Sequence, residues 1–269
     1  MAVTDDFQLA FDGLDLGDGT VYDLIAHRGF GMPGVRSADR TLSQRDGKHA
    51  GDDYLDERVI ELTFEIDGTA SAATVNTLTF QLPGYAGGGV RRVNVRPRRL
   101  DQPGTLEQSR GLSTVDMQVV ATDPRMYADA ESSSSTSLPS GGTGLSWPLT
   151  WPLNWGTITN SGLAVADNAG NYPAPVTIRV DGPVTNPSVE NLTVGKTVEL
   201  LLTVAAGDFV LIDPNERTVL LNGTASRYSA LTAASEWWLL EPGVNEIRFQ
   251  ASTSTAATMT LTWRSAWIG

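Results

Sequence analysis

The residues of this chain that could do chemistry are few and scattered. There is no cysteine, and the two histidines are His27 and His49. The absence of thiols removes disulfides, thiolate zinc sites and cysteine nucleophiles together. A serine hydrolase needs a positioned nucleophile, and the chain has no Gly-x-Ser-x-Gly turn. We therefore expect no enzyme, no cofactor and no metal site, and we interpret both histidines as surface residues.

A Gly-x-Gly-x-x-Gly pattern runs from Gly29 to Gly34 and could indicate a dinucleotide loop. That chemistry requires a helix starting at the loop, so that its N-terminus faces a pyrophosphate. Pro33 and the polar stretch 36–40 predict no such helix, and no βαβ unit follows. We interpret this segment as a flexible loop.

Acidic residues gather at two places in the first half of the chain. A calcium loop needs oxygens at alternate positions and a distant bidentate Glu, and neither cluster has that spacing. The clusters are Asp12, Asp15 and Asp18, and Asp52, Asp53, Asp56 and Glu57. We interpret both as solvated turns. Hydrolysis by two carboxylates far apart in the chain stays open, because the sequence singles out no pair.

One basic cluster stands out against a formal net charge of -12. Strand alternation would place Val93 and Val95 on one face and the polar side chains on the other. Nucleic-acid contact is one reading, but the chain is acidic and the cluster has no interleaved aromatic residues. We favour ion pairs with a neighbouring subunit. The cluster comprises Arg91, Arg92, Arg96, Arg98 and Arg99.

Tryptophan recurs every four residues at Trp147, Trp151 and Trp155. The intervening prolines forbid a helix, so this stretch is extended or turn structure. Exposed rings would suit saccharide stacking, whereas buried rings would cover the start of a second domain. We favour the covering role and keep the saccharide site as the alternative.

The elements that must position these residues are mostly strands. Period-two alternation is clearest over 59–68 and recurs over 7–11, 20–25, 91–96 and 115–120. Helical spacing occurs once, over Ala70–Leu82, where Val75, Leu78 and Leu82 follow steps of three and four. A long polar segment, 28–56, has a hairpin tip at 45–48 and is of a kind that usually serves binding or assembly.

Two domains follow from a serine-rich stretch that predicts a linker over 129–146. Residues 1–128 form the first domain, a β-domain with one helix. Residues 147–269 form the second, where six short β-rich runs separated by turn residues predict a β-sandwich. The acidic N-terminus does not resemble a secretory signal, and the longest apolar run is too short to cross a bilayer, so we expect assembly in the cytoplasm.

Several stretches, in order along the chain, resemble the distal tail (Dit) protein family of siphovirus-type bacteriophages. Two lie in the first domain: the arginine-rich segment and strand over 40–68, and Asp123-Pro124-Arg125-Met126-Tyr127, which is similar to the Asp-Pro-x-x-Tyr that closes the family's N-terminal domain. Three lie in the second domain, at 170–187, 206–223 and 237–247.

The resemblance implies a structural virion protein at the tail tip. Its N-terminal β-sandwich or barrel-like domain would form a ring, hexameric in the family, and a galectin-like C-terminal sandwich would hang outside it. The implied partners are further copies of the chain, the tail tube, the tape-measure protein and the tip or receptor-binding proteins, while genomic DNA passes through without specific binding. The candidate subunit-interface residues are Arg36, Arg40, Arg45, Asp46, Arg91, Arg92 and Arg96. The alternative function is a carbohydrate-binding protein that attaches to host-surface saccharide.

Overall fold

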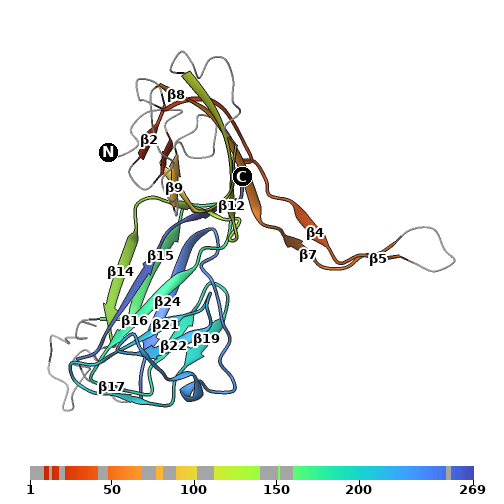
Figure 1. The fold of residues 1–269 in the computed structure, drawn as a ribbon. Helices are drawn as coiled ribbons and strands as arrows, with labels where there is room; N and C mark the ends of the chain where they lie inside the picture. Colours follow the sequence, from red (N-terminus) through yellow and green to blue (C-terminus); the bar gives the residue numbers. More distant parts are fainter. Residues whose placement is uncertain are drawn as a thin grey trace. The chain divides into compact units, whose positions relative to one another are not determined.

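The chain forms two compact units in the computed structural model (Figure 1). Residues 1–129 and 267–269 make the first unit, and residues 130–266 make the second. The structure describes residues 9–11, 14–17, 22–41, 48–67, 77–80, 89–101, 112–139, 151, 160–252 and 256–269. In these ranges the one helical element is the 3-10 turn η2 (Tyr228–Ala230), and no helix is long and apolar enough to span a membrane.

The first unit is built from two β-sheets. One sheet has the order β2-β1-β9-β10-β13-β26, with β2 Leu14–Leu16, β1 Leu9–Phe11, β9 Thr77–Phe80, β10 Arg91–Asn94, β13 Met126–Ala128 and β26 Ala266–Trp267. The other has the order β11-β12-β8-β3, with β11 Arg96–Asp101, β12 Leu112–Ala121, β8 Arg58–Asp67 and β3 Tyr22–Arg28.

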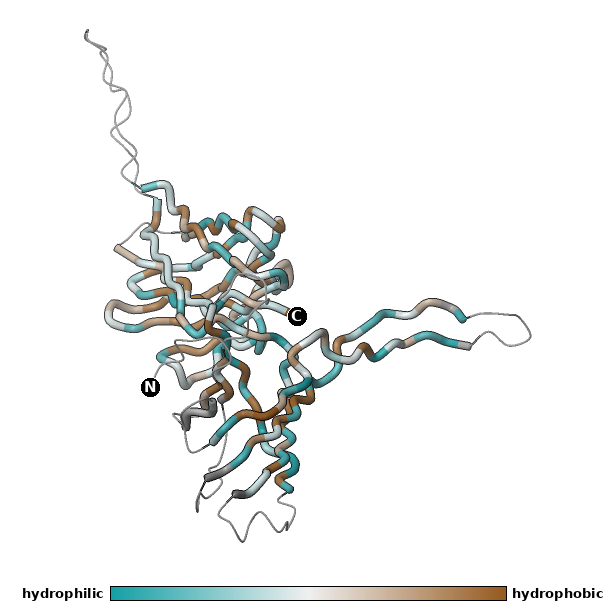
Figure 2. The backbone as a smooth tube through the Cα atoms, turned by 90° about the horizontal axis from the view of Figure 1, so that it is seen from above, coloured by the Kyte–Doolittle hydropathy of each residue, from teal (hydrophilic) through white to brown (hydrophobic). Residues whose placement is uncertain are grey.

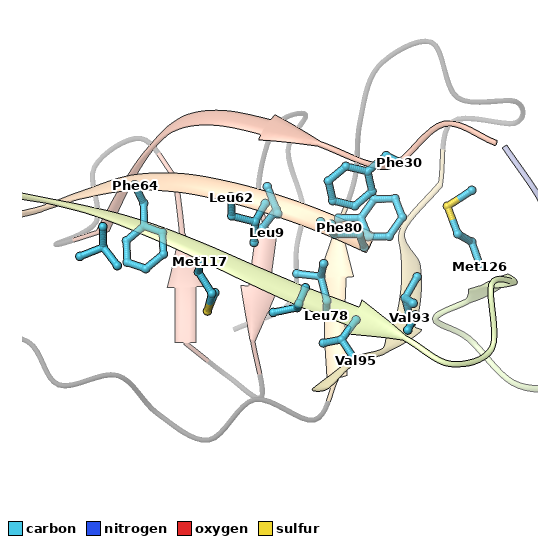
Figure 3. Close-up of a cluster of buried hydrophobic side chains, with 14 of the residues drawn as sticks. Leu9, Phe30, Leu62, Phe64, Leu78, Phe80, Val93, Val95, Met117 and Met126 are labelled. Atoms are coloured by element: carbon cyan, nitrogen blue, oxygen red, sulfur yellow. The ribbon is translucent and has the colours of Figure 1, made fainter. Parts of the chain in front are cut away.

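One hydrophobic core lies between these sheets (Figure 3). Strand β8 contributes Ile60, Leu62 and Phe64, which alternate with more exposed residues, as a half-buried strand requires. The opposite sheet contributes Leu78 and Phe80, both fully buried. Each such side chain stabilises the fold by roughly 1.5–3 kcal/mol.

The helix expected over Ala70–Leu82 is wrong where the structure describes this segment. Thr77–Phe80 is strand β9, paired with β1 and β10. Leu78 and Phe80 point into the core with Thr79 between them, so period-two burial prevails here over the steps of three and four. The rest of the expected helix lies outside the described residues.

The polar segment between β3 and β8 is a two-stranded arm, here defined as residues 34–57. Strand β4 (Val35–Ser37) pairs with β7 (Asp53–Leu55), and further out β5 (Arg40–Thr41) pairs with β6 (Lys48–His49). Figures 1 and 2 show the arm extending away from the strands that carry it. Nearly all its described residues are exposed, so it has no core of its own.

The second unit is a β-sandwich of two main sheets. The larger has the order β14-β25-β16-β21-β22-β23, with β14 Ser132–Ser137, β25 Thr258–Trp263, β16 Val176–Asp181, β21 Phe209–Asp213, β22 Thr218–Leu221 and β23 Ala225–Ser226. The smaller has the order β15-β24-β18-β19, with β15 Leu163–Asn168, β24 Gly243–Gln250, β18 Ser188–Asn191 and β19 Lys196–Glu199. A short pair, β17 (Val184–Thr185) and β20 (Thr203–Val204), lies beside them. The mainly β fold expected from the sequence is confirmed.

The serine run that predicted a linker is instead strand β14. All six residues from Ser132 to Ser137 pair in register with β25. Thr136 is buried, and its hydroxyl lies 3.3 Å from Asn160 Oδ1. Composition alone misleads here, because a serine strand on a sheet edge needs few apolar side chains once its backbone is paired. Residues 140–146 of the expected linker lie outside the described ranges.

Candidate assembly surface

Backbone hydrogen bonds hold the arm together along its length. The N–H of Asp56 donates to Gly34 O (2.7 Å) near its base, and the N–H of Ala38 donates to Asp52 O (3.1 Å). Farther out, the N–H of Gly51 donates to Asp39 Oδ1 (2.9 Å), and this bond lowers the pKa of Asp39. A two-stranded hairpin without a packed face is marginally stable in water, so the arm is suited to contact another surface.

The arm presents both signs of charge. Its described residues include Arg36, Arg40 and Lys48, and none of these three forms an ion pair in the described part of the chain. The acidic cluster 52–57 lies on the returning strand, and Tyr54 there is 54% exposed. Unpaired charges of both signs and an exposed aromatic ring can provide specificity to a protein contact.

A fully buried arginine fixes the base of the arm. Arg58 is 1% exposed at the start of β8. Its guanidinium donates to Gly29 O (3.0 Å) and Gly31 O before the arm, to Pro124 O (2.9 Å) after β12, and to Ile268 O (3.0 Å) in the C-terminal tail. One side chain therefore ties three distant segments of the first unit together. The burial of Arg58 could have been inferred from the alternation of β8, because Arg58 stands two residues before Ile60 and so lies on the inward face of the strand.

Gly29 allows the chain to pass close to β8. Its φ is +93°, and a Cβ there would lie 1.9 Å from Val59 O. The Gly-x-Gly-x-x-Gly segment therefore lies between two strands, β3 and β4, and no helix begins at it. Gly29 serves backbone packing, whereas a Cβ at Gly31 would meet nothing within 4 Å, and the segment is a loop as expected.

The Asp-Pro-x-x-Tyr motif forms a closed turn. Asp123 accepts hydrogen bonds from the backbone N–H of Arg125 (3.1 Å) and from the hydroxyl of Tyr127. Burial raises the pKa of Tyr127, and the carboxylate of Asp123 raises it further. Pro124 O in this turn accepts from Arg58, so the motif and the base of the arm form one structural unit.

The predicted interface arginines fall into different environments. Arg36 and Arg40 lie on the arm and Arg96 lies on β11, all three exposed. Arg91 is 7% exposed and stacks on Trp267, with its Cζ 3.4 Å from the ring centroid, and burial lowers its pKa. Arg91 therefore stabilises its own unit and is not exposed for a partner. Arg92 is half-buried and lies 3.8 Å from Asp129.

The remaining predicted residues are less informative. Arg45, Asp46, Trp147 and Trp155 lie outside the described residues. Trp151 is 86% exposed, so this ring does not cover a core as the favoured reading expected.

A hollow of about 330 Å³ lies on the four-stranded sheet of the first unit. Its wall carries opposite charges on neighbouring strands, among them Arg28, Glu61, Arg99 and Asp116. Thr63 Oγ1 donates to Asp116 Oδ1 at 2.7 Å. No three His, Asp or Glu side chains of the described ranges gather in a metal-binding group.

Comparison with known proteins finds a matching family model for part of the second unit and a similar fold for nearly the whole chain. Residues 169–267 match the family model described as the siphovirus-type tail component, C-terminal domain. The crystal structure of SPP1 Dit, described as a paradigm of hub adsorption apparatus in phages infecting Gram-positive bacteria, aligns with a TM-score of 0.63. That alignment has 16% identity and covers 95% of this chain and 97% of the other.

Other comparisons are weaker. Two structures of the phage P2 baseplate in its activated conformation, with Ca and with Sr, align at 12% and 13% identity with TM-scores of 0.49 and 0.47. Each alignment covers 95% of this chain and 97% or 96% of the other. No curated protein sequence matches the chain.

Residues 169–267, which make up most of the second unit, are thus similar to the C-terminal domain of siphovirus-type tail components. The resemblance that the sequence motifs indicated is borne out by the family-model match over these residues and by a fold similar to that of SPP1 Dit along nearly the whole chain.

Proposed function

We propose that the protein is the hub subunit of a phage tail tip, where copies of the chain form a closed ring, hexameric as the family resemblance implies. The ring joins the tail tube and tape-measure region to the tip and receptor-binding proteins and lets DNA pass without binding it. It is assembled in the host cytoplasm and acts without catalytic turnover. The expected galectin-like character of the second unit belongs to this same proposal.

The observation that carries the proposal is the arm. An exposed hairpin with no core and with unpaired charges of both signs suits a head-to-tail contact, in which one subunit's arm lies on the next subunit's body. Heterologous contacts of this kind close into rings. Because Arg58 holds the base of the arm, the orientation of the arm relative to the sheets of the first unit would be fixed.

The test is the mass and shape of the purified full chain, by mass photometry and electron microscopy. We expect rings for the natural sequence and loss of rings for Arg36→Glu/Arg40→Glu, with an unchanged melting temperature because both side chains are exposed. The matched control is Lys196→Glu/Arg227→Glu, which reverses two exposed charges on the second unit. Rings formed equally well by the arm variant would refute the arm contact.

The alternative function, attachment to host saccharide, has support in the exposed ring of Trp151. A flat indole in water can stack on a sugar. Loss of saccharide retention in Trp151→Ala would favour this function at the site that the tryptophan spacing predicted.

A further inference from the structure

The outer face of the larger sheet in the second unit carries a block of nine polar side chains. Strands β14, β25 and β16 are adjacent, and their outward residues align in three rows across the sheet. The rows are Ser133–Thr262–Thr177, Ser135–Thr260–Arg179 and Ser137–Thr258–Asp181. Neighbours are spaced about 4.8 Å across the strands and about 6.8 Å along them. Seven of the nine side chains are hydroxyls, and none is apolar.

These hydroxyls are largely unused inside the protein. Over the described ranges, Ser137 is the one member of the block whose hydroxyl has a hydrogen-bond partner, the Nδ2 of Asn160 at 3.0 Å. The other six are exposed or half-buried on the sheet face. Each can donate one hydrogen bond and accept two. The block therefore offers both donors and acceptors to anything laid flat upon it.

Arg179 is held rigidly at one side of the block. Its Nε lies 3.0 and 3.1 Å from the two carboxylate oxygens of Asp181, and its Nη2 lies 2.7 Å from Oδ1. Its Cζ lies 3.8 Å from the ring centroid of Phe209, so the guanidinium is held both by this ring and by its hydrogen bonds to Asp181. The Nη1 donors have no partner among the described residues. The arginine thus presents oriented donors while Asp181 neutralises its charge.

The chemistry of this block selects among ligands. Protein interfaces need apolar or aromatic anchors at their centre, and none of the nine side chains is one. On the neighbouring strand β21, Phe209 and Leu211 lie beside the block but are half-buried, and the Phe209 ring is covered by the Arg179 guanidinium. The outer face of the smaller sheet has them, since Val165 and Val244 are 52% and 60% exposed. Polyanions need uncompensated positive charge, which is absent from a neutral block on a protein of net charge -12. We propose that the block binds a neutral saccharide chain laid across β14, β25 and β16, with Arg179 and the threonine hydroxyls as its hydrogen-bonding partners.

The test is retention of the purified full chain on an array of neutral and anionic oligosaccharides. We expect binding to neutral glucose-, galactose- or N-acetylglucosamine-based chains. Arg179→Ala should weaken it at least about tenfold, and the nearly isosteric Thr260→Val about three- to tenfold. The matched control is Arg248→Ala, which removes the other sheet's outer-face arginine, paired with Glu190. Melting temperatures of all variants should stay within a few degrees of the natural chain.

Three results would overturn the assignment. They are no binding to any neutral chain, binding to anionic chains alone, and binding that survives Arg179→Ala but is lost in Trp151→Ala. Ring formation is scored in the same samples. Because Arg179 lies far in the sequence from the arm and outside its unit, failure of the saccharide site would leave the assembly proposal intact, and the reverse also holds.

Discussion

Arg58 is the residue at which three separate backbone segments of the first unit meet. It is charged, fully buried and donates to carbonyl groups of three separate segments. Arg58→Ala would remove the shared donor of these part-buried hydrogen bonds, each contributing roughly 1–3 kcal/mol, and would empty the space of a fully buried side chain. We expect a loss of at least about 3 kcal/mol in the free energy of unfolding, measured by urea denaturation.

Arg58→Lys should rescue little of this loss, because a single ammonium cannot reach the positions that the planar guanidinium serves. Arg99→Ala is the control, since Arg99 is an exposed surface residue whose pair with Asp101 should contribute below about 1 kcal/mol. Equal stability of the Arg58 and Arg99 variants would contradict the anchoring role.

Two glycines of one loop allow a matched comparison. Gly29→Ala would place a methyl group 1.9 Å from Val59 O at a φ of +93°, whereas a Cβ at Gly31 meets nothing within 4 Å. We expect Gly29→Ala to lower the free energy of unfolding by at least about 1–3 kcal/mol, and Gly31→Ala to change it by at most about 0.5 kcal/mol. Thermal denaturation of both proteins checks this, and similar melting temperatures would show that the close approach at Gly29 is unimportant.

Tyr127 makes stability depend on alkaline pH. Its pKa is raised above 10 by burial and by Asp123, whereas in the unfolded chain it ionises near pH 10. Above that pH the unfolded chain has lost a proton that the native state keeps, so stability falls as pH rises. Tyr127→Phe should cost about 0.5–1.5 kcal/mol at neutral pH through the lost hydrogen bond and should flatten the alkaline fall. The measurement is chemical denaturation of both proteins from pH 8 to 11. If stability falls equally steeply in both, the alkaline fall belongs to groups other than Tyr127.

At the scale of elements, the arm should be the least protected of the paired strands that the structure describes in the unassembled chain. Its backbone hydrogen bonds lie between two exposed strands with no packed face, so local opening should cost little. Amide exchange of the unassembled chain should be fast over 35–41 and 48–56 and slow over β8 and β12. If the arm forms the contact between subunits, ring formation should slow its exchange by at least about tenfold. Unchanged exchange on assembly would exclude the arm from the contact.

The sequence predicted the elements whose own pattern decides their structure. Strand β8 and most strands of the second unit alternate strictly, and their burial follows that alternation. The prediction from sequence pattern failed at β9, because a strand of four residues has too few positions to distinguish steps of two from steps of three and four. It failed again at β14, where the strand is set by pairing with β25, which is more than 100 residues away in the chain.

The candidate interface was predictable in part. The long polar segment signalled an exposed arm, and Arg36 and Arg40 lie on it as expected. The buried state of Arg91 was not predictable, because it depends on Trp267 at the far end of the chain. No local pattern in the sequence indicates that these two residues meet.

At the scale of the whole molecule, the chain leaves the first unit near residue 129, builds the second, and returns for its last residues. Residues 267–269, the returning tail, contribute a buried side chain and a hydrogen-bond acceptor to the first unit. Trp267 is 7% exposed in that unit's core and supports Arg91, and Ile268 O accepts a hydrogen bond from Arg58. The two buried arginines in the described part of the first unit therefore both depend on a segment that follows the second unit in sequence.

Ending the chain at Ala266 should consequently destabilise the first unit and spare the second. Loss of a buried tryptophan costs about 3–5 kcal/mol, and the two arginines would in addition lose an aromatic face and a carbonyl acceptor. Calorimetry and amide exchange should show earlier opening of β8, β10 and β12, with β16, β21 and β24 unchanged, and Trp267→Ala should reproduce most of the effect. Trp151→Ala, which removes an 86% exposed ring, is the control and should change neither unit. If the truncated chain kept the natural protection of β8 and β10, the tail would be an appendage of the first unit and not a part of its core.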